Sequence, residues 1–163
     1  MKKKLLVIIG LVLAACSAGA AAYLVSTNSR NNELNIGAVT TEIVEQFTPP
    51  SDIRPGEVIP KNVRIKNTGE NDCYVRVQVL FSDEDMKGLC SVDYNTSDWV
   101  LHDGWYYYRN ILGADETTRP LFTAVTISQT ADEGSLSDFD IFIRQESRQS
   151  HGQNTYASAW SLT

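Results

Sequence analysis

The feature that most restricts the fold of this chain is a two-residue alternation of apolar and polar side chains, which returns in short segments from residue 39 onward. The clearest of these segments is residues 73–81. Successive side chains of a β-strand point to opposite faces, so the segment predicts a strand with one buried face. The expected inward residues are Cys73, Val75, Val77, Val79 and Phe81, and the expected outward residues are Tyr74, Arg76 and Gln78.

Other segments with the same period predict further strands. Residues 99–102 and 105–108 flank Asp103-Gly104, a strong signal for a two-residue hairpin turn. The remaining expected inward residues are Val39, Thr41, Ile43 and Phe47 in residues 39–47, Val63 and Ile65 in the next segment, Leu121, Thr123, Val125 and Ile127 in residues 121–127, and Phe139, Ile141 and Ile143 in residues 139–147. The expected outward residues are Arg64, Lys66, Asp140, Arg144 and Glu146.

Two stretches lack this alternation. Residues 82–97 are acidic and polar and predict a long loop. Residues 155–160 predict a short closing helix, with Thr155 as its N-cap and Trp160 over an open end of the domain.

About seven short strands, each with a single apolar face, predict two packed antiparallel sheets. The expected fold class is therefore all-β, a two-sheet antiparallel β-sandwich spanning residues 38–163. Residues 23–37 contain a stretch rich in Ser, Asn and Thr and predict a flexible N-terminal arm in front of it.

The N-terminus carries the pattern of an export signal. Three lysines after Met1 precede an apolar run over residues 5–15 and then small residues up to Ala22, which predicts a signal peptide over residues 1–22 cleaved between Ala22 and Tyr23. A competing interpretation is the Leu-Ala-Ala-Cys ending at Cys16, which resembles a bacterial lipobox and would place a lipid on that cysteine. An uncut anchor over residues 5–25 is a third interpretation, weakened by its glycines and Ser17.

The charge of the chain limits its partners. It has 14 Lys and Arg against 20 Asp and Glu, a net charge of -6, and loss of the three signal lysines takes this from -6 to -9. Binding to a nucleic-acid backbone or an anionic membrane surface requires clustered Lys and Arg, so neither is an expected partner. Membrane contact is expected only through the signal segment or a lipid on Cys16.

The residue patterns do not favour an enzyme. The two histidines, His102 and His151, are far apart in the chain, and no His-Glu-x-x-His motif or nucleophile motif is present. The spacing of Asp93, Asn95 and Ser97 is similar to the start of a calcium loop, but Asp98 replaces the required glycine and no glutamate closes the loop. We therefore expect a solvated acidic loop and no cofactor.

Two groups of residues leave alternatives open. Cys73 and Cys90 pair as a disulfide in an oxidising exterior, or remain a buried apolar residue and a loop anchor. In a strand over residues 105–108, Trp105 and Tyr107 face one way and Tyr106 and Tyr108 the other. At least one pair is expected in the core, and the exposed pair is a candidate contact surface for a polymer or another subunit.

Several motifs together resemble a known family. They are Ala22-Tyr23-Leu24, Asn35-Ile36-Gly37, Glu45-Gln46-Phe47 with Pro55-Gly56, Lys66-Asn67-Thr68-Gly69, Tyr74-Val75-Arg76-Val77, Asp103-Gly104 with the four aromatic residues, residues 116–122, and Ala159-Trp160. Their order is similar to that of the TasA/camelysin family of Gram-positive exported proteins, whose signals resemble those cut by the signal peptidase SipW. The resemblance covers nearly the whole chain. It implies a jelly-roll-like β-sandwich, export, and cleavage at Ala22 rather than before Cys16.

The resemblance implies a function as well. In the TasA branch it implies a matrix or fibre subunit of biofilms, secreted or held at the cell surface. The camelysin name implies a metallo-endopeptidase, which the residues do not support. We expect self-association, or binding to another matrix protein, through an arm whose apolar residues add a strand to a neighbour's sheet edge. Those residues are Leu24, Val25, Leu34 and Ile36. A lipid-anchored surface binding module is the other alternative.

Overall fold

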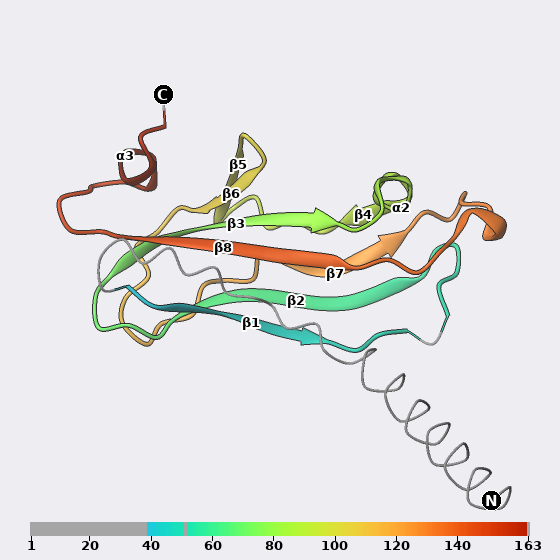
Figure 1. Ribbon diagram of the computed structural model, residues 1–163, viewed down its shortest axis with the longest axis horizontal. Helices are drawn as coiled ribbons and strands as arrows, with labels where there is room; N and C mark the ends of the chain where they lie inside the picture. The colour runs from blue at the N-terminus through green and yellow to red at the C-terminus, as the bar shows by residue number, and fades with distance from the viewer. Residues whose placement is uncertain (1–38, 51, 163) are drawn as a thin grey trace, which may run out of the picture. The chain divides into compact units, whose positions relative to one another are not determined.

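Two packed, four-stranded antiparallel sheets form the domain (Figure 1). The structure, a computed structural model, describes residues 39–50 and 52–162, so the signal segment and the arm lie outside the described residues. One sheet has the order β1-β2-β7-β4 and the other β5-β6-β3-β8. The strands are β1 (Thr41–Phe47), β2 (Val58–Asn67), β3 (Cys73–Phe81), β4 (Cys90–Val92), β5 (Trp99–His102), β6 (Trp105–Tyr108), β7 (Phe122–Ile127) and β8 (Ile141–Gln149). The predicted all-β, two-sheet sandwich is confirmed.

The chain crosses repeatedly from one sheet to the other, as it does in a jelly roll. It crosses between β2 and β3, β3 and β4, β4 and β5, β6 and β7, and β7 and β8. Short helical segments complete the described fold: α2 (Glu84–Gly88), η1 (Glu133–Ser135) and α3 (Tyr156–Trp160).

The core lies between the sheets and uses the predicted inward faces. Val63 and Ile65 of β2 and Val75 and Val77 of β3 are completely buried. Each such side chain contributes roughly 1.5–3 kcal/mol relative to an exposed position. Trp99, Leu112, Leu121, Phe122 and Val125 pack in the same cluster.

Two residues break the predicted alternation. Phe122 is buried and Thr123 exposed, the reverse of the expectation for Thr123. The pairing of β2 with β7 shifts register between Pro60 and Val63, and this irregularity changes which residues of β7 face the core. Phe47 was expected inward but is 45% exposed at the end of β1.

The prediction of a loop over residues 82–97 is wrong, because the stretch contains α2 and β4. The carboxylate of Asp83 caps α2 by accepting hydrogen bonds from the N–H groups of Asp85 and Met86. Met86 is buried with Ile59 and Ile127 in a second cluster. A short acidic segment with one apolar residue is thus an N-capped turn that closes one end of the sandwich.

The predicted closing helix is confirmed as α3, and Thr155 and Ser158 form its capping box. Trp160, however, does not cover an open end. It packs with Tyr74 and Tyr107 on the outer face of the second sheet. For this reason Tyr74, expected at an outward and exposed position, is buried.

The predicted hairpin of β5 and β6 is also confirmed. Asp103 and Gly104 both have positive φ, 48° and 76°, as a two-residue turn of this kind requires.

Replacing Val77 by Asp is expected to abolish cooperative unfolding. An unpaired carboxylate in the completely buried position costs more than the roughly 5–15 kcal/mol that stabilises a domain. Leu101→Asp is the matched control, because Leu101 is 59% exposed and its variant should melt like the wild-type protein. Thermal unfolding followed by circular dichroism measures both, and a wild-type melt for Val77→Asp would show that the assigned inward face is wrong.

Candidate functional site

The two sides of the sandwich have edges of very different length. The edge strands β4 and β5 have three and four residues, whereas β1 and β8 have seven and nine. β8 pairs with β3 over its whole length without a register shift, and β1 does the same with β2. Neither long edge contains Pro or Gly. Natural sheets protect their edges by shortening, bulging or interrupting them, and these two edges have none of those protections.

The register also defines which backbone groups of β8 point away from β3. Ser150 and Asp140 bond to Asp72 and Ser82 of the partner strand. Because hydrogen-bonded pairs alternate along an antiparallel ladder, the even-numbered residues of β8 bond to β3. The N–H and C=O groups of Ile143, Gln145 and Ser147 therefore face the open edge.

One side chain connects the two long edges. The amide nitrogen of Gln145 on β8 donates a hydrogen bond of 2.8 Å to the carbonyl of Thr41 on β1. The other amide atom, Oε1, is buried and accepts no hydrogen bond from the described residues. This side of the sandwich, which we call the long-edge side (β1 and β8), therefore holds a buried acceptor with unused capacity.

An inward-facing lysine on β2 explains the position of Phe47. Lys61 is opposite Phe47 in the register and is 6% exposed. Its ammonium pairs with Glu45 and lies 4.5 Å from the centroid of the Phe47 ring. Phe47 thus covers a buried charge instead of joining the core. The sequence analysis did not identify Lys61, since a lysine in an alternating segment suggests an outward position.

The four aromatic residues of β6 are divided between two clusters. Tyr106 and Tyr108 pack with the sandwich core, while Trp105 and Tyr107 lie with α3 on the outer face. Tyr107 is 2% exposed. The prediction that one pair forms a free contact surface is therefore wrong for Tyr107, and only Trp105 of that pair is partly accessible.

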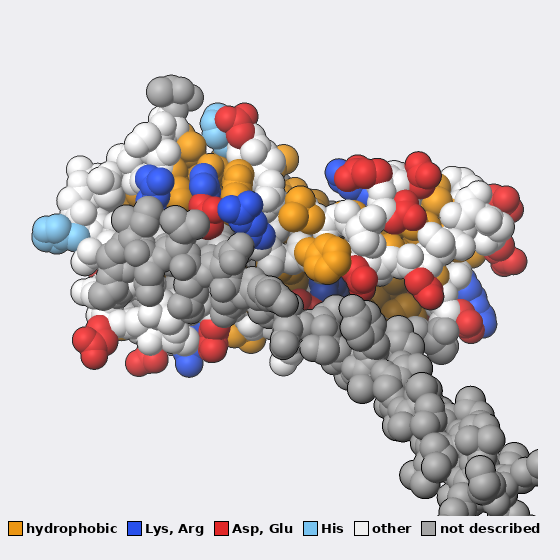
Figure 2. Space-filling view, viewed as in Figure 1, with side chains coloured by type: hydrophobic (Ala, Val, Ile, Leu, Met, Phe, Trp, Pro, Cys, Tyr) orange, Lys and Arg blue, Asp and Glu red, His pale blue; other side chains and the backbone are white. Residues whose placement is uncertain are grey.

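Arginine and tryptophan side chains alternate on the outer face of the second sheet. The guanidinium carbon of Arg76 lies 4.2 Å from the ring centroid of Trp105 and 4.1 Å from that of Trp160. Arg144 extends this arrangement beside Trp105 at 5.2 Å, and Arg148 beside Trp160 at 4.5 Å. We call these five residues the Arg–Trp stack. Figure 2 shows blue and orange side chains alternating over β8 near α3.

The stack is only partly neutralised. Glu146 accepts hydrogen bonds from both Arg76 and Arg144. Arg148 donates to the carbonyl of Ala159 and so ties α3 to β8. Sequence reasoning assigned Arg76, Arg144 and Glu146 to the outward face, but it missed their grouping because the partners come from four separate elements.

The two cysteines of the domain have the surroundings of structural residues. Cys73 and Cys90 are both free thiols, so of the two alternatives the structure has the buried apolar residue and the loop anchor, not the disulfide. Burial, with a smaller effect of Asp72, raises the pKa of Cys73 to about 12, and burial also raises the pKa of Cys90. Both thiols therefore remain protonated and weakly nucleophilic at neutral pH.

The Asp93 carboxylate faces the backbone of β7. It accepts hydrogen bonds from the N–H groups of Thr123 and Ala124 and from the Thr123 hydroxyl. Partial burial tends to raise its pKa, but these hydrogen bonds outweigh that effect and hold the pKa below the usual value. Asn95 organises the following turn through the N–H groups of Ser97 and Asp98. The loop is thus internally bonded, not simply solvated as expected.

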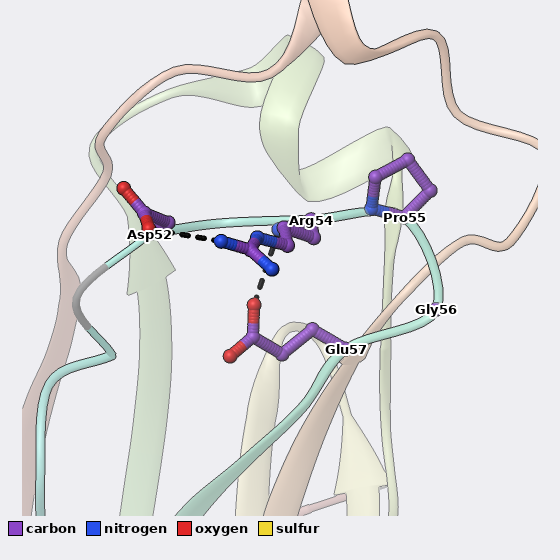
Figure 3. A pocket seen from close by; sticks show the side chains of 5 residues that line it. All are labelled: Asp52, Arg54, Pro55, Gly56 and Glu57. Atoms are coloured by element: carbon purple, nitrogen blue, oxygen red, sulfur yellow. Dashed lines mark hydrogen bonds and ion pairs between the residues drawn. The ribbon is translucent and has the colours of Figure 1, made fainter.

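The two histidines differ in exposure and setting: His151 is exposed, and His102 is half-buried, 3.3 Å from the carboxylate of its neighbour Asp103. Within residues 39–50 and 52–162, no three His, Cys, Asp or Glu side chains are grouped to hold a metal ion. Figure 3 shows a hollow lined by Asp52, Arg54, Pro55, Gly56 and Glu57, in which the Arg54 guanidinium donates to the Asp52 carboxylate and the Arg54 backbone N–H donates to the Glu57 carboxylate.

Comparisons with known proteins gave no match: no family model, curated protein or solved structure is significantly similar to this chain. None of the described helices is long and apolar enough to cross a membrane.

Replacing Asp93 by Asn is expected to cost about 1–2 kcal/mol of unfolding free energy at pH 7, because three donors lose their charged acceptor. A carboxyl with a depressed folded-state pKa stabilises above its unfolded pKa, and this contribution is lost as the pH falls through the folded value. The difference from wild type should therefore shrink as the pH falls below 3.8, the ordinary pKa of an aspartate. Urea unfolding over a series of pH values from 7 downward measures it, with Asp138→Asn as an exposed control.

Chelation with EDTA is expected to leave the melting temperature unchanged, since the Asp93 carboxylate already bonds to β7. A large drop that calcium reverses would contradict this assignment of the loop.

Proposed function

We propose that this chain is an exported structural protein of the cell surface or biofilm matrix, which associates with its own copies or another matrix protein by strand addition. The proposal joins the export signal and the arm predicted from the sequence to one observation. That observation is the pair of long, regular edges β1 and β8 on one side of the sandwich. An extended segment that pairs with such an edge gains main-chain hydrogen bonds along its whole length.

The chemistry of the edge supports β8 as the acceptor. Ile143, Gln145 and Ser147 offer outward N–H and C=O groups at alternate positions. The arm, residues 23–37, supplies apolar side chains at Leu24, Val25, Leu34 and Ile36. The two alternatives from the sequence, a metallo-endopeptidase and a lipid-anchored module, are not favoured by any contact described above.

Deleting residues 23–35 from the mature protein is expected to leave the domain folded and to abolish concentration-dependent oligomers. The described core begins at Val39, so the deletion removes none of the described core residues. Ile36→Pro should weaken the same assembly, because proline removes a ladder donor. Light scattering and electron microscopy measure assembly. Oligomers of the truncated protein equal to those of wild type would exclude the arm as the donor.

The acceptor edge has its own test. Ser147→Pro removes an N–H that faces the open edge, so assembly should fall while the melting temperature changes little. Leu101→Pro is the matched control on the short edge β5, where the alternation of hydrogen-bonded pairs also directs the N–H outward. The control should assemble like wild type. Equal assembly by both variants would show that β8 does not receive the arm.

A further inference from the structure

Three loops meet at one end of the sandwich. They are residues 48–57, 82–89 and 128–140, which connect β1 to β2, β3 to β4 and β7 to β8. Phe81 is opposite Ile141, and Cys90 is opposite Ile127, so the corresponding strand ends are neighbours. Ile53, Met86 and Leu136, one from each loop, pack in the same apolar cluster.

This end is strongly acidic, and we call it the acidic end. Its three loops carry Asp52, Glu57, Asp83, Glu84, Asp85, Asp132, Glu133, Asp138 and Asp140, against the cations Arg54 and Lys87. Most of these side chains are exposed. Figure 2 shows red side chains gathered around α2 and the loop before β8.

The opposite half of the second sheet carries the Arg–Trp stack. Arg148 is opposite Tyr74 near the start of β3, and α3 follows β8 at that end. The side chain of Arg144 is 51% exposed. Beyond Arg144, toward the acidic end, Leu80 and Phe142 form a cross-strand pair and are 43% and 49% exposed. Arginine, tryptophan and exposed apolar side chains on one face are the residue types enriched in the centres of protein interfaces.

We propose that the Arg–Trp stack binds the acidic end of a second copy of this chain. The inference rests on the proposed self-association and names a second contact for it. Charge complementarity carries the inference: three arginines with one partial counter-charge, Glu146, face outward on a chain whose net charge is -6. The aromatic rings on both sides of Arg76 hold its guanidinium in place, so little side-chain entropy remains to be lost on binding.

The positions of the two surfaces determine the symmetry of the contact. They are different patches at different ends of the domain, so copies joined through them are related head to tail. Such a heterologous contact leaves a free patch at each end of a pair and continues as an open chain or a ring. It is therefore a second contact in addition to strand addition along the long-edge side.

Charge reversal tests the contact. Arg144→Glu should weaken association of the mature protein about ten-fold, because it places like charges in the contact. Glu133→Lys with Asp138→Lys, on the acidic end, should weaken it as well, although this change lowers the net negative charge. The combination of all three changes in one chain should restore association, since the attraction between the two surfaces returns. Sedimentation velocity and light scattering measure the association, and wild type should also dissociate as salt rises.

The controls distinguish loss of a specific contact from loss of folding and from a change in net charge. Arg109→Glu makes the same charge change at an exposed position outside the stack and should associate like wild type. Each variant should keep the wild-type melting temperature within a few degrees.

The outcomes distinguish this inference from the proposed function. One outcome is that wild type assembles, that the arm deletion abolishes assembly, and that Arg144→Glu assembles like wild type. In that case the stack contact is wrong and strand addition stands. If Arg144→Glu prevents binding of polygalacturonate but not self-association, the stack receives an anionic polymer and the inference is overturned. If wild type remains monomeric at high concentration, the stack contact between copies is wrong; if it also binds no other matrix protein, the proposed function fails as well.

Discussion

Each strand of this protein has only one apolar face, and this constraint determines the rest of the structure. A single sheet would leave Val63 and Ile65 or Val75 and Val77 in water, so the two sheets must pack face to face. Once they pack, each sheet still ends in two edge strands, whose outer sides no other described strand covers. The core therefore explains the stability of the domain, and the edges that it cannot cover are the natural places for association.

The edges are not equivalent, and the difference is physical. β4 and β5 are too short to pair with more than a few residues of another chain, whereas β1 and β8 are long and regular. Gln145 connects the long edges through its amide nitrogen, while its Oε1 accepts no hydrogen bond from the described residues. A strand added here would extend an existing ladder without disturbing the core. Assembly at this edge therefore does not require a less stable domain.

The outer face of the second sheet has two uses. Trp160 and Tyr107 bury one part of it under α3, which fastens the C-terminal segment to the sheet. Arg76 lies between Trp105 and Trp160, and Arg144 and Arg148 lie beside the same two rings. The same contacts that hold α3 therefore arrange charge at the surface, opposite in sign to the loops around α2.

The period of the sequence by itself determined the two-sheet class, the inward face of β3, the hairpin at Asp103-Gly104 and the cap of α3, because these depend on neighbouring residues in the chain. Tertiary structure decided what depends on distant segments. Tyr74 is buried only because α3 returns to β3, and Lys61 is inward only because Glu45 and Phe47 accompany it on β1. Likewise, the spacing of Cys73 and Cys90 in the chain could not decide between a disulfide and two free thiols, and the folded chain has two free thiols. Local pattern indicates which face most strand residues take, but only the folded chain determines what covers that face and where a register shift reverses it.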